Sequence, residues 1–275
     1  MRKILRRIHV LVRGSLAAMF FLSEFVYFWL SFHVYLRRAR QRAEENYREL
    51  GLITRDKALH QDLKLVTARW GMNYSAHTVW WSQKVLGYKF EYDVPRKLPR
   101  SLIIVVRHTS SMDIPWVLTI CKHINRPITW IAKKQAGSWP SLGLALYLLD
   151  SALVKRDHSL QDKIRVWVCA RKALRSGISI LIFPSGSRSS SKTQGGGFNA
   201  ACSVFDEYAD SPEDIGVLTL DIRGLHRHLI KTIFRTGDLA GKTVTVIGKL
   251  DMDVISLPKA DRIAWLKRTQ AEQGK

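Results

Sequence analysis

The residue pair best suited to catalysis is His108 and Asp113, which follow the apolar run 102–106. We expect Ser110 or Ser111 to cap a helix that starts here, so that Asp113 lies in its first turn. A carboxylate on one imidazole nitrogen fixes the tautomer and supports the charge gained when the other nitrogen takes a proton. The pair would then be a general base for a substrate hydroxyl. The same spacing also occurs in purely structural His–Asp pairs.

A second chemical feature follows the apolar run 178–183. Here Gly186 permits close approach of the backbone, Ser185 and Ser187 offer hydroxyls, and Arg188 offers a planar fork. This combination predicts a cradle for a phosphate group. The alternative is a flexible polar loop with a solvated arginine.

Basic residues stand at the ends of two further apolar runs. Lys133 and Lys134 follow the run 128–132, and Arg156 ends the run 152–156. In an open α/β sheet the active site forms outside the carboxyl ends of the strands. We therefore expect the histidine, the carboxylate and the cations to meet at one edge of a sheet. Taken alone, a terminal arginine more often extends its charge into solvent.

The elements that must position these residues are short β-rich runs that alternate with helical patterns from residue 88 onwards. Continuous apolar runs separated by helices are typical of a buried, largely parallel sheet, so an α/β fold flanked by helices is predicted. The strands are expected at 88–93, 102–107, 128–132, 152–156, 178–183, 215–220 and 243–249. The helices are expected at 113–123, 138–149, 159–176, 197–209 and 258–272.

Residues 14–36 contain a single charged side chain, Glu24, and are long enough to cross a bilayer as a helix. Basic residues on both sides leave the orientation undecided and equally fit a helix that enters one leaflet. Tyr27, Ser31 and Tyr35 share a helical face with Glu24, which favours a partner helix or lipid headgroups. A buried helix of the soluble core is the remaining alternative.

A second helix is expected over residues 63–86, with Trp70, Trp80 and Trp81. Indole rings favour both membrane interfaces and helix–helix contacts, and the sequence does not separate the two. The expected domains are a membrane-attachment helix with a basic, charge-mixed linker at 1–62, the second helix of an N-terminal pair at 63–87, and an α/β domain at 88–275.

The charge balance requires an anionic partner. Lys and Arg number 44 against 23 Asp and Glu, which gives a net charge of +21. Nine tryptophans and the apolar N-terminal run favour anionic membrane lipids, and no nucleic-acid module is recognisable, so no nucleic acid is expected. Three scattered cysteines, Cys121, Cys169 and Cys202, fit neither a disulfide framework nor a metal site. We expect reduced thiols and no metal.

The order of the motifs is more specific than any one of them. An H-x4-D after one strand, an arginine at the end of another and F-P-x-G-x-R-S after a third resemble the glycerophospholipid acyltransferase family, which includes the lysophosphatidate (1-acylglycerol-3-phosphate) acyltransferases. The resemblance covers roughly residues 65–250. It implies that His108 is the general base and that Asp113 orients it.

The resemblance also assigns the residues that bind the acceptor. It implies that Arg156, Gly186 and Arg188 bind its phosphate, with Ser187 in place of the usual Thr and Lys133 facing the phosphate. Ser185 stands where the family usually has Glu, and Arg107 where it usually has Asn. The identity of the acceptor therefore stays open.

The function implied is transfer of a fatty acyl group from acyl-CoA or an acyl carrier protein to a hydroxyl of a lysophospholipid, without a cofactor. The resemblance further implies an enzyme of phospholipid biosynthesis that is membrane-associated through an N-terminal helical pair, at the cytoplasmic face (the inner membrane in a bacterium). One rival is an inactive family member that binds anionic lipid or nucleic acid through its basic edge. Another is a hydrolase with Ser110 or Ser111 as the nucleophile, which lacks the usual G-x-S-x-G turn.

Overall fold

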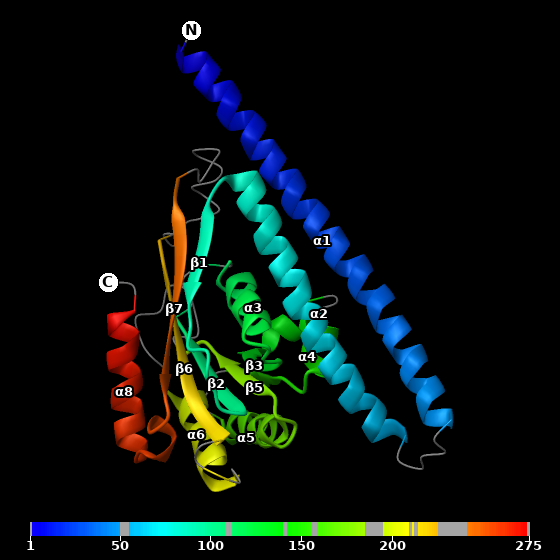
Figure 1. Ribbon diagram of the computed structural model, residues 1–275, viewed down its shortest axis with the longest axis vertical. Coiled ribbons are helices and arrows are strands. Elements are labelled where there is room, and N and C mark those ends of the chain that lie inside the picture. Colours follow the sequence, from blue (N-terminus) through cyan, green and yellow to red (C-terminus); the bar gives the residue numbers. More distant parts are fainter. Residues whose placement is uncertain are drawn as a thin grey trace.

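The computed structural model describes residues 2–49, 55–107, 110, 112–139, 142–155, 159–184, 195–208, 211, 214–224 and 241–273. Two long helices lie beside a twisted sheet that carries further helices (Figure 1). The helices are α1 (Arg2–Glu49), α2 (Arg55–Leu86), α3 (Asp113–His123), η1 (Lys134–Ser138), α4 (Leu142–Leu148), α5 (Leu160–Arg175), α6 (Gly196–Tyr208), η3 (Val254–Ser256) and α8 (Lys259–Glu272). The strands are β1 (Lys89–Asp93), β2 (Ser101–Val106), β3 (Ile128–Lys133), β4 (Ala152–Val154), β5 (Ser179–Ile182), β6 (Ile215–Arg223) and β7 (Thr243–Asp251).

The described strands form one seven-stranded sheet in the order β1-β7-β6-β2-β5-β3-β4. Strands β6, β2, β5, β3 and β4 are parallel to one another, whereas β7 runs antiparallel to β6 and parallel to β1. Every residue of the central strand β2 is buried, as expected for a parallel strand with helices on both faces. The predicted largely parallel sheet is confirmed.

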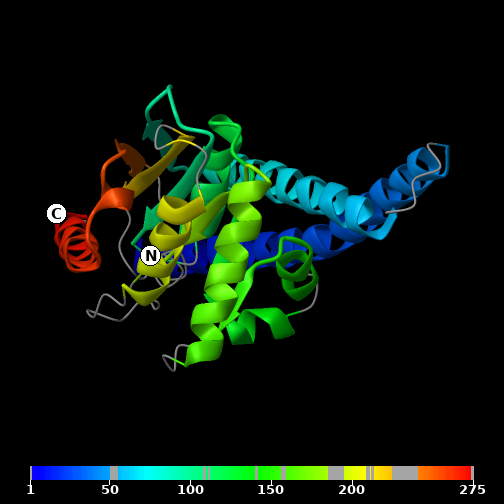
Figure 2. The same ribbon diagram turned by 90° about the horizontal axis from the view of Figure 1, so that it is seen from below.

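Two layers of helices cover the sheet. One apolar cluster joins alternate residues of β2, β5 and β6, such as Ile103, Ile180 and Val217, to α5, α6 and α8. The intervening residues, such as Ile104 and Leu181, pack on the other side against α2 and α3. Figure 2 shows α5 and α6 side by side and α1 and α2 projecting together beyond the sheet. The carboxyl ends of the parallel strands lie between these layers.

Helices α1 and α2 pack against each other through aromatic rings. Phe32 and Trp70 are buried with ring centroids 4.7 Å apart, and Phe28 lies 4.9 Å from Trp70. In contrast, Trp80 and Trp81 of α2 are exposed. The structure thus separates the indoles: Trp70 fills a helix–helix contact, whereas the other two face outwards.

The helix predicted at 14–36 lies within α1, and the one predicted at 63–86 lies within α2. The helix predicted at 138–149 is partly wrong, because η1 ends at Ser138 and α4 begins only at Leu142. Trp139 between them is extended, which is the conformation favoured before a proline such as Pro140. Among the helices of the described residues, none has an apolar stretch long enough to cross a membrane.

A buried cation joins the N-terminal helices to the sheet domain. Nζ of Lys64 in α2 is 3.1 Å from Oδ2 of Asp150, which lies in the turn between α4 and β4. Nζ of Lys172 in α5 is 2.7 Å from Oδ1 of the same carboxylate. Burial alone would raise the pKa of Asp150, but hydrogen bonds and charges from Lys172 and Lys64 outweigh it and lower the pKa below its ordinary value.

We predict that Asp150→Asn lowers the free energy of unfolding by about 3 kcal/mol at neutral pH, because Lys64 then stays buried without a counter-charge. Asparagine keeps the left-handed backbone of this position, where φ is 54°. The difference from the wild type should shrink as the pH falls below about 4, because a carboxylate with a lowered folded pKa stabilises only while it is ionised. Urea unfolding at several pH values measures both effects.

Lys172→Met is the control for this experiment, since its side chain is 53% exposed and its ion pair is worth less than about 1 kcal/mol. Equal stability of Asp150→Asn and the wild type would show that the Lys64 contact does not anchor the helices.

Candidate active site

Four neighbouring parallel strands end at the same edge of the sheet. Val105 lies opposite Ile182, and Ile182 lies opposite Ile131. Lys133, the last residue of β3, lies opposite Val154, the last residue of β4. The ends of β2, β5, β3 and β4 are thus level within about two residues. The predicted site residues all lie at or just after these ends in sequence.

The turn between β2 and α3 is closed by polar contacts. Asp113 is the first residue of α3 and is completely buried, and its Oδ2 accepts a hydrogen bond of 2.7 Å from the main-chain N–H of Ser110. The N–H of Met112 in turn donates to Oγ of Ser110 over 3.2 Å. A carboxylate in the first turn of a helix is also favoured by the helix dipole. The sequence therefore fixes this turn locally.

The predicted cap is wrong in detail. Met112 precedes α3 and makes no side-chain capping bond, and Ser111 lies outside the described residues. The physical reason is that Oγ of Ser110 accepts the N–H of Met112 within the turn before α3. This hydroxyl therefore closes the turn and does not cap the helix. The predicted position of Asp113 in the first helical turn is correct.

Helix α3 is held in place by its buried aromatic side. Trp116 is buried between α2 and β1, and its Nε1 donates to Oη of Tyr88 over 3.3 Å. Oη of Tyr88 is also 2.7 Å from Oγ of Ser82 in α2. These contacts fix the end of α3 that carries Asp113 relative to both the sheet and α2.

Two of the predicted site residues lie within the described residues. Asp113 is buried at the start of α3, and Lys133 is exposed at the end of β3. The others, His108, Arg156, Ser185, Gly186, Ser187 and Arg188, lie outside the described residues. Within the described part of the chain, no group of three or more His, Cys, Asp or Glu side chains could hold a metal ion.

Sequence reasoning missed the contacts that hold the segment before Arg156. Oδ1 of Asp162, a buried carboxylate in the first turn of α5, accepts a hydrogen bond of 3.1 Å from the main-chain N–H of Lys155. The N–H of Asp162 donates to Oγ of Ser159, the helix cap, over 3.3 Å. The signal was present as Ser159-x-x-Asp162, the spacing of a capping box. Asp162 thus fixes the chain as it leaves β4.

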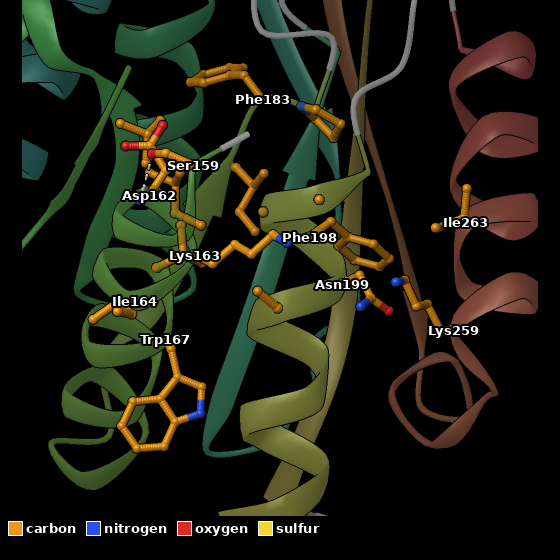
Figure 3. A pocket seen from close by; sticks show the side chains of 18 residues that line it. Ser159, Asp162, Lys163, Ile164, Trp167, Phe183, Phe198, Asn199, Lys259 and Ile263 are labelled. Carbon is orange, nitrogen blue, oxygen red and sulfur yellow. Dashed lines mark hydrogen bonds between the residues drawn. The ribbon is translucent and has the colours of Figure 1, made fainter. Parts of the chain in front are cut away.

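A cavity of about 470 Å³ lies between α5 and α6, beside the ends of β3, β4 and β5 (Figure 3). Lys163 of α5 and Lys259 of α8 lie on opposite sides of Phe198. Phe183 and Pro184, which precede the predicted phosphate loop in sequence, also line the cavity. Gly196, the first residue of α6, also lines the cavity. The apolar part of the lining includes Ile131, Val154, Ile182, Trp167, Phe198 and Ile263. No local pattern in the sequence signals this cavity.

Residues 89–218 match the sequence profile of the family described as Acyltransferase. The chain carries an acyltransferase-family domain. The crystal structure of the 1-acyl-sn-glycerophosphate (LPA) acyltransferase PlsC from Thermotoga maritima has a similar fold, with a TM-score of 0.52 and 17% sequence identity over 99% of this chain and 97% of that one. No curated protein sequence matches the chain. Residues 89–218 thus match the acyltransferase family that the motifs predicted, and the predicted α/β fold with an N-terminal helical pair is confirmed.

The cysteines of this acyltransferase domain are not suited to hold an acyl group. Cys121, Cys169 and Cys202 are free and buried. Burial raises the pKa of the Cys121 and Cys202 thiols to about 12 and also raises that of Cys169. Because the thiolate is the nucleophile, these thiols are unreactive at neutral pH. In the folded state these three residues are therefore poorly suited to form a covalent acyl-cysteine intermediate.

We predict that Ellman's reagent modifies none of the three cysteines of the native protein within minutes at pH 8, and all three after unfolding in guanidinium chloride. The unfolded sample is the positive control. Rapid modification of the native protein would show that at least one thiol is accessible and ionised.

Proposed function

We propose that the protein transfers a fatty acyl group from acyl-CoA or an acyl carrier protein to a hydroxyl of a lysophospholipid. The observation that carries this proposal is the buried Asp113 at the start of α3, five residues after His108, where four parallel strands end together. The match to the acyltransferase family supports the reaction class. The similar fold of the 1-acyl-sn-glycerophosphate acyltransferase PlsC supports the acceptor class.

His108 would remove the proton of the acceptor hydroxyl while Asp113 stabilises the imidazolium. The hydroxyl oxygen then bonds to the thioester carbonyl carbon, the carbon–sulfur bond breaks, and the thiolate leaves and receives a proton. Because a thiolate leaves readily, the reaction needs no enzyme nucleophile. This agrees with the buried, unreactive cysteines.

The acceptor phosphate would be bound by cations that come from different strand ends. Lys133 ends β3, Arg156 follows β4, and Arg188 lies in the loop after β5. An arginine fork matches two phosphate oxygens, and lysine adds a point charge. Asp162 supports this arrangement because it fixes the main chain at Lys155, directly before Arg156. Ser185 stands where a carboxylate is usual, so either its neutral hydroxyl receives the acceptor hydroxyl or the acceptor differs from lysophosphatidate.

The cavity between α5 and α6 suits the acyl chain of the donor. Its lining is largely apolar, it lies next to Phe183 and Pro184, and its volume of about 470 Å³ falls in the range of small-molecule sites. An acyl chain held there would have its thioester end beside Pro184, which directly precedes the predicted phosphate loop in sequence.

The outer faces of α1 and α2 favour attachment to an anionic membrane surface at the cytoplasmic side. Trp29, Trp80 and Trp81 are between 41% and 51% exposed, a large area of indole ring for a protein surface. Tryptophan favours the headgroup region, and the exposed Arg37 and Arg38 provide charges for acidic lipids.

We predict that His108→Ala lowers turnover by about 1,000-fold and that Asp113→Asn lowers it by about 100-fold, because a positioned general base contributes within this range. Release of free coenzyme A from acyl-CoA, measured with a panel of lysolipids, gives both values, and lipidomics of the product identifies the acceptor. His123→Ala, at the exposed far end of α3, should leave turnover unchanged.

Substantial turnover by His108→Ala would refute its role as the base. If the wild type releases no thiol but binds DNA with steep salt dependence, the rival assignment of a binding protein holds. Circular dichroism and thermal unfolding show whether each variant is folded.

We predict that replacing Trp29, Trp80 and Trp81 together by Ser lowers binding to vesicles with about 30% anionic lipid by about 10-fold or more, because less apolar area is transferred from water. Flotation of protein with vesicles measures the bound fraction. Leu160→Ser, which alters a 71% exposed apolar residue of α5, is the control. Unchanged flotation of the triple variant would show that these three indole rings do not contribute to lipid binding.

A further inference from the structure

The residue that follows α8 contacts Arg107, which joins strand β2 to His108. Strand β2 ends at Val106, and Arg107 is the one residue between this strand and His108. Nη1 of Arg107 donates a hydrogen bond to the main-chain carbonyl of Gln273, the residue that follows α8. Two parts of the chain that are 166 residues apart thus meet directly before the predicted general base.

The same glutamine also contacts the neighbouring strand. Nε2 of Gln273 donates to the carbonyl of Leu220 in β6 over 3.2 Å, and Leu220 lies opposite Val106 in the sheet. Gln270 of α8 donates to Oε1 of Gln273 over 2.7 Å. The exposed fractions of Gln270 and Gln273 are 6% and 4%. Because a buried amide is costly unless it is hydrogen-bonded, these contacts fix the side chain of Gln273.

Helix α8, which precedes Gln273, is itself fixed to the rest of the domain. The guanidinium of Arg262 donates to Oδ2 of Asp206 over 3.2 Å and to Oγ of Ser203 over 3.0 Å, both on α6. Leu266 is completely buried in the core. Gln273 itself is extended, with φ −65° and ψ 124°. Its carbonyl therefore does not follow the direction of the helical carbonyls and can accept the hydrogen bond from Arg107.

The segment between β2 and α3 is therefore held at two points. Arg107 is held by Gln273 before His108, and the N–H of Ser110 is held by Asp113 after it. We propose that Arg107 and Gln273 are positioning residues that fix the main chain on the strand side of His108, so that its imidazole is presented to the acceptor. This inference rests on the proposed function. It also gives a use to the arginine that replaces the asparagine usual at position 107.

The test is a double-variant cycle. Kinetic constants are measured for the wild type, Arg107→Met, a chain that ends at Glu272, and the chain with both changes. We expect kcat to fall about 10-fold in Arg107→Met, with the KM values of donor and acceptor changed less than about two-fold, because the variant misplaces the base without removing a substrate contact. The combined variant should equal the shortened chain, since both changes remove one link. Arg268→Met, which alters an exposed arginine of α8, is the matched control and should retain full kcat.

The proposal would be overturned if Arg107→Met raised the KM of the acceptor and if the two falls in kcat multiplied in the combined variant. Arg107 would then bind the acceptor. Unchanged kcat in Arg107→Met would also overturn it. Hydrogen exchange of the amides at 107–113 gives a readout that does not depend on turnover: faster exchange in Arg107→Met supports the link, and unchanged exchange refutes it. If the wild type shows no turnover, the proposed function fails, and the exchange data still decide whether Gln273 holds this segment.

Discussion

The structure depends on the register of the parallel strands. Because β2, β5, β3 and β4 end level with one another, residues that are distant in sequence leave the sheet at the same edge. A shift of one residue would move a strand end by about 3.3 Å and turn its side chains to the other face. Helices on both faces bury β2 completely, so a shifted strand would lose its packing. The register of the sheet is therefore also the geometry of the site.

The same device fixes the chain at two of these strand ends. After β2, the carboxylate of Asp113 accepts the N–H of Ser110, and after β4 the carboxylate of Asp162 accepts the N–H of Lys155. Both carboxylates lie in the first turn of a helix, where the dipole favours negative charge. An anion thus orders the main chain directly beside residues that are predicted to handle a proton or a phosphate. At Arg107 the contact differs, because the guanidinium of its side chain donates to the main-chain carbonyl of Gln273.

The N-terminal helices are attached by different forces on their two sides. Their inner sides are joined to the domain by packing of Phe32 and Trp70 against α4 and by the ion pair of Lys64 with Asp150. Their outer sides leave indole rings such as Trp80 exposed. Under the proposed membrane attachment, a helical pair fixed to the sheet domain would hold the strand ends at a constant distance from the lipid surface. This links the basic, tryptophan-rich composition to the position of the site.

The amino-acid sequence alone determined the elements and the order of the motifs, because periodicity and apolar runs reflect local conformation. It correctly placed Asp113 in the first turn of a helix, but it did not predict the break at Trp139. Only the tertiary structure decided which indoles are buried, where the cavity lies and which residues meet Arg107. These features join segments that are up to 166 residues apart, and their contacts depend on how whole helices pack. A local sequence pattern contains no information about such packing, so the contact of Gln273 with Arg107 could not be predicted from it.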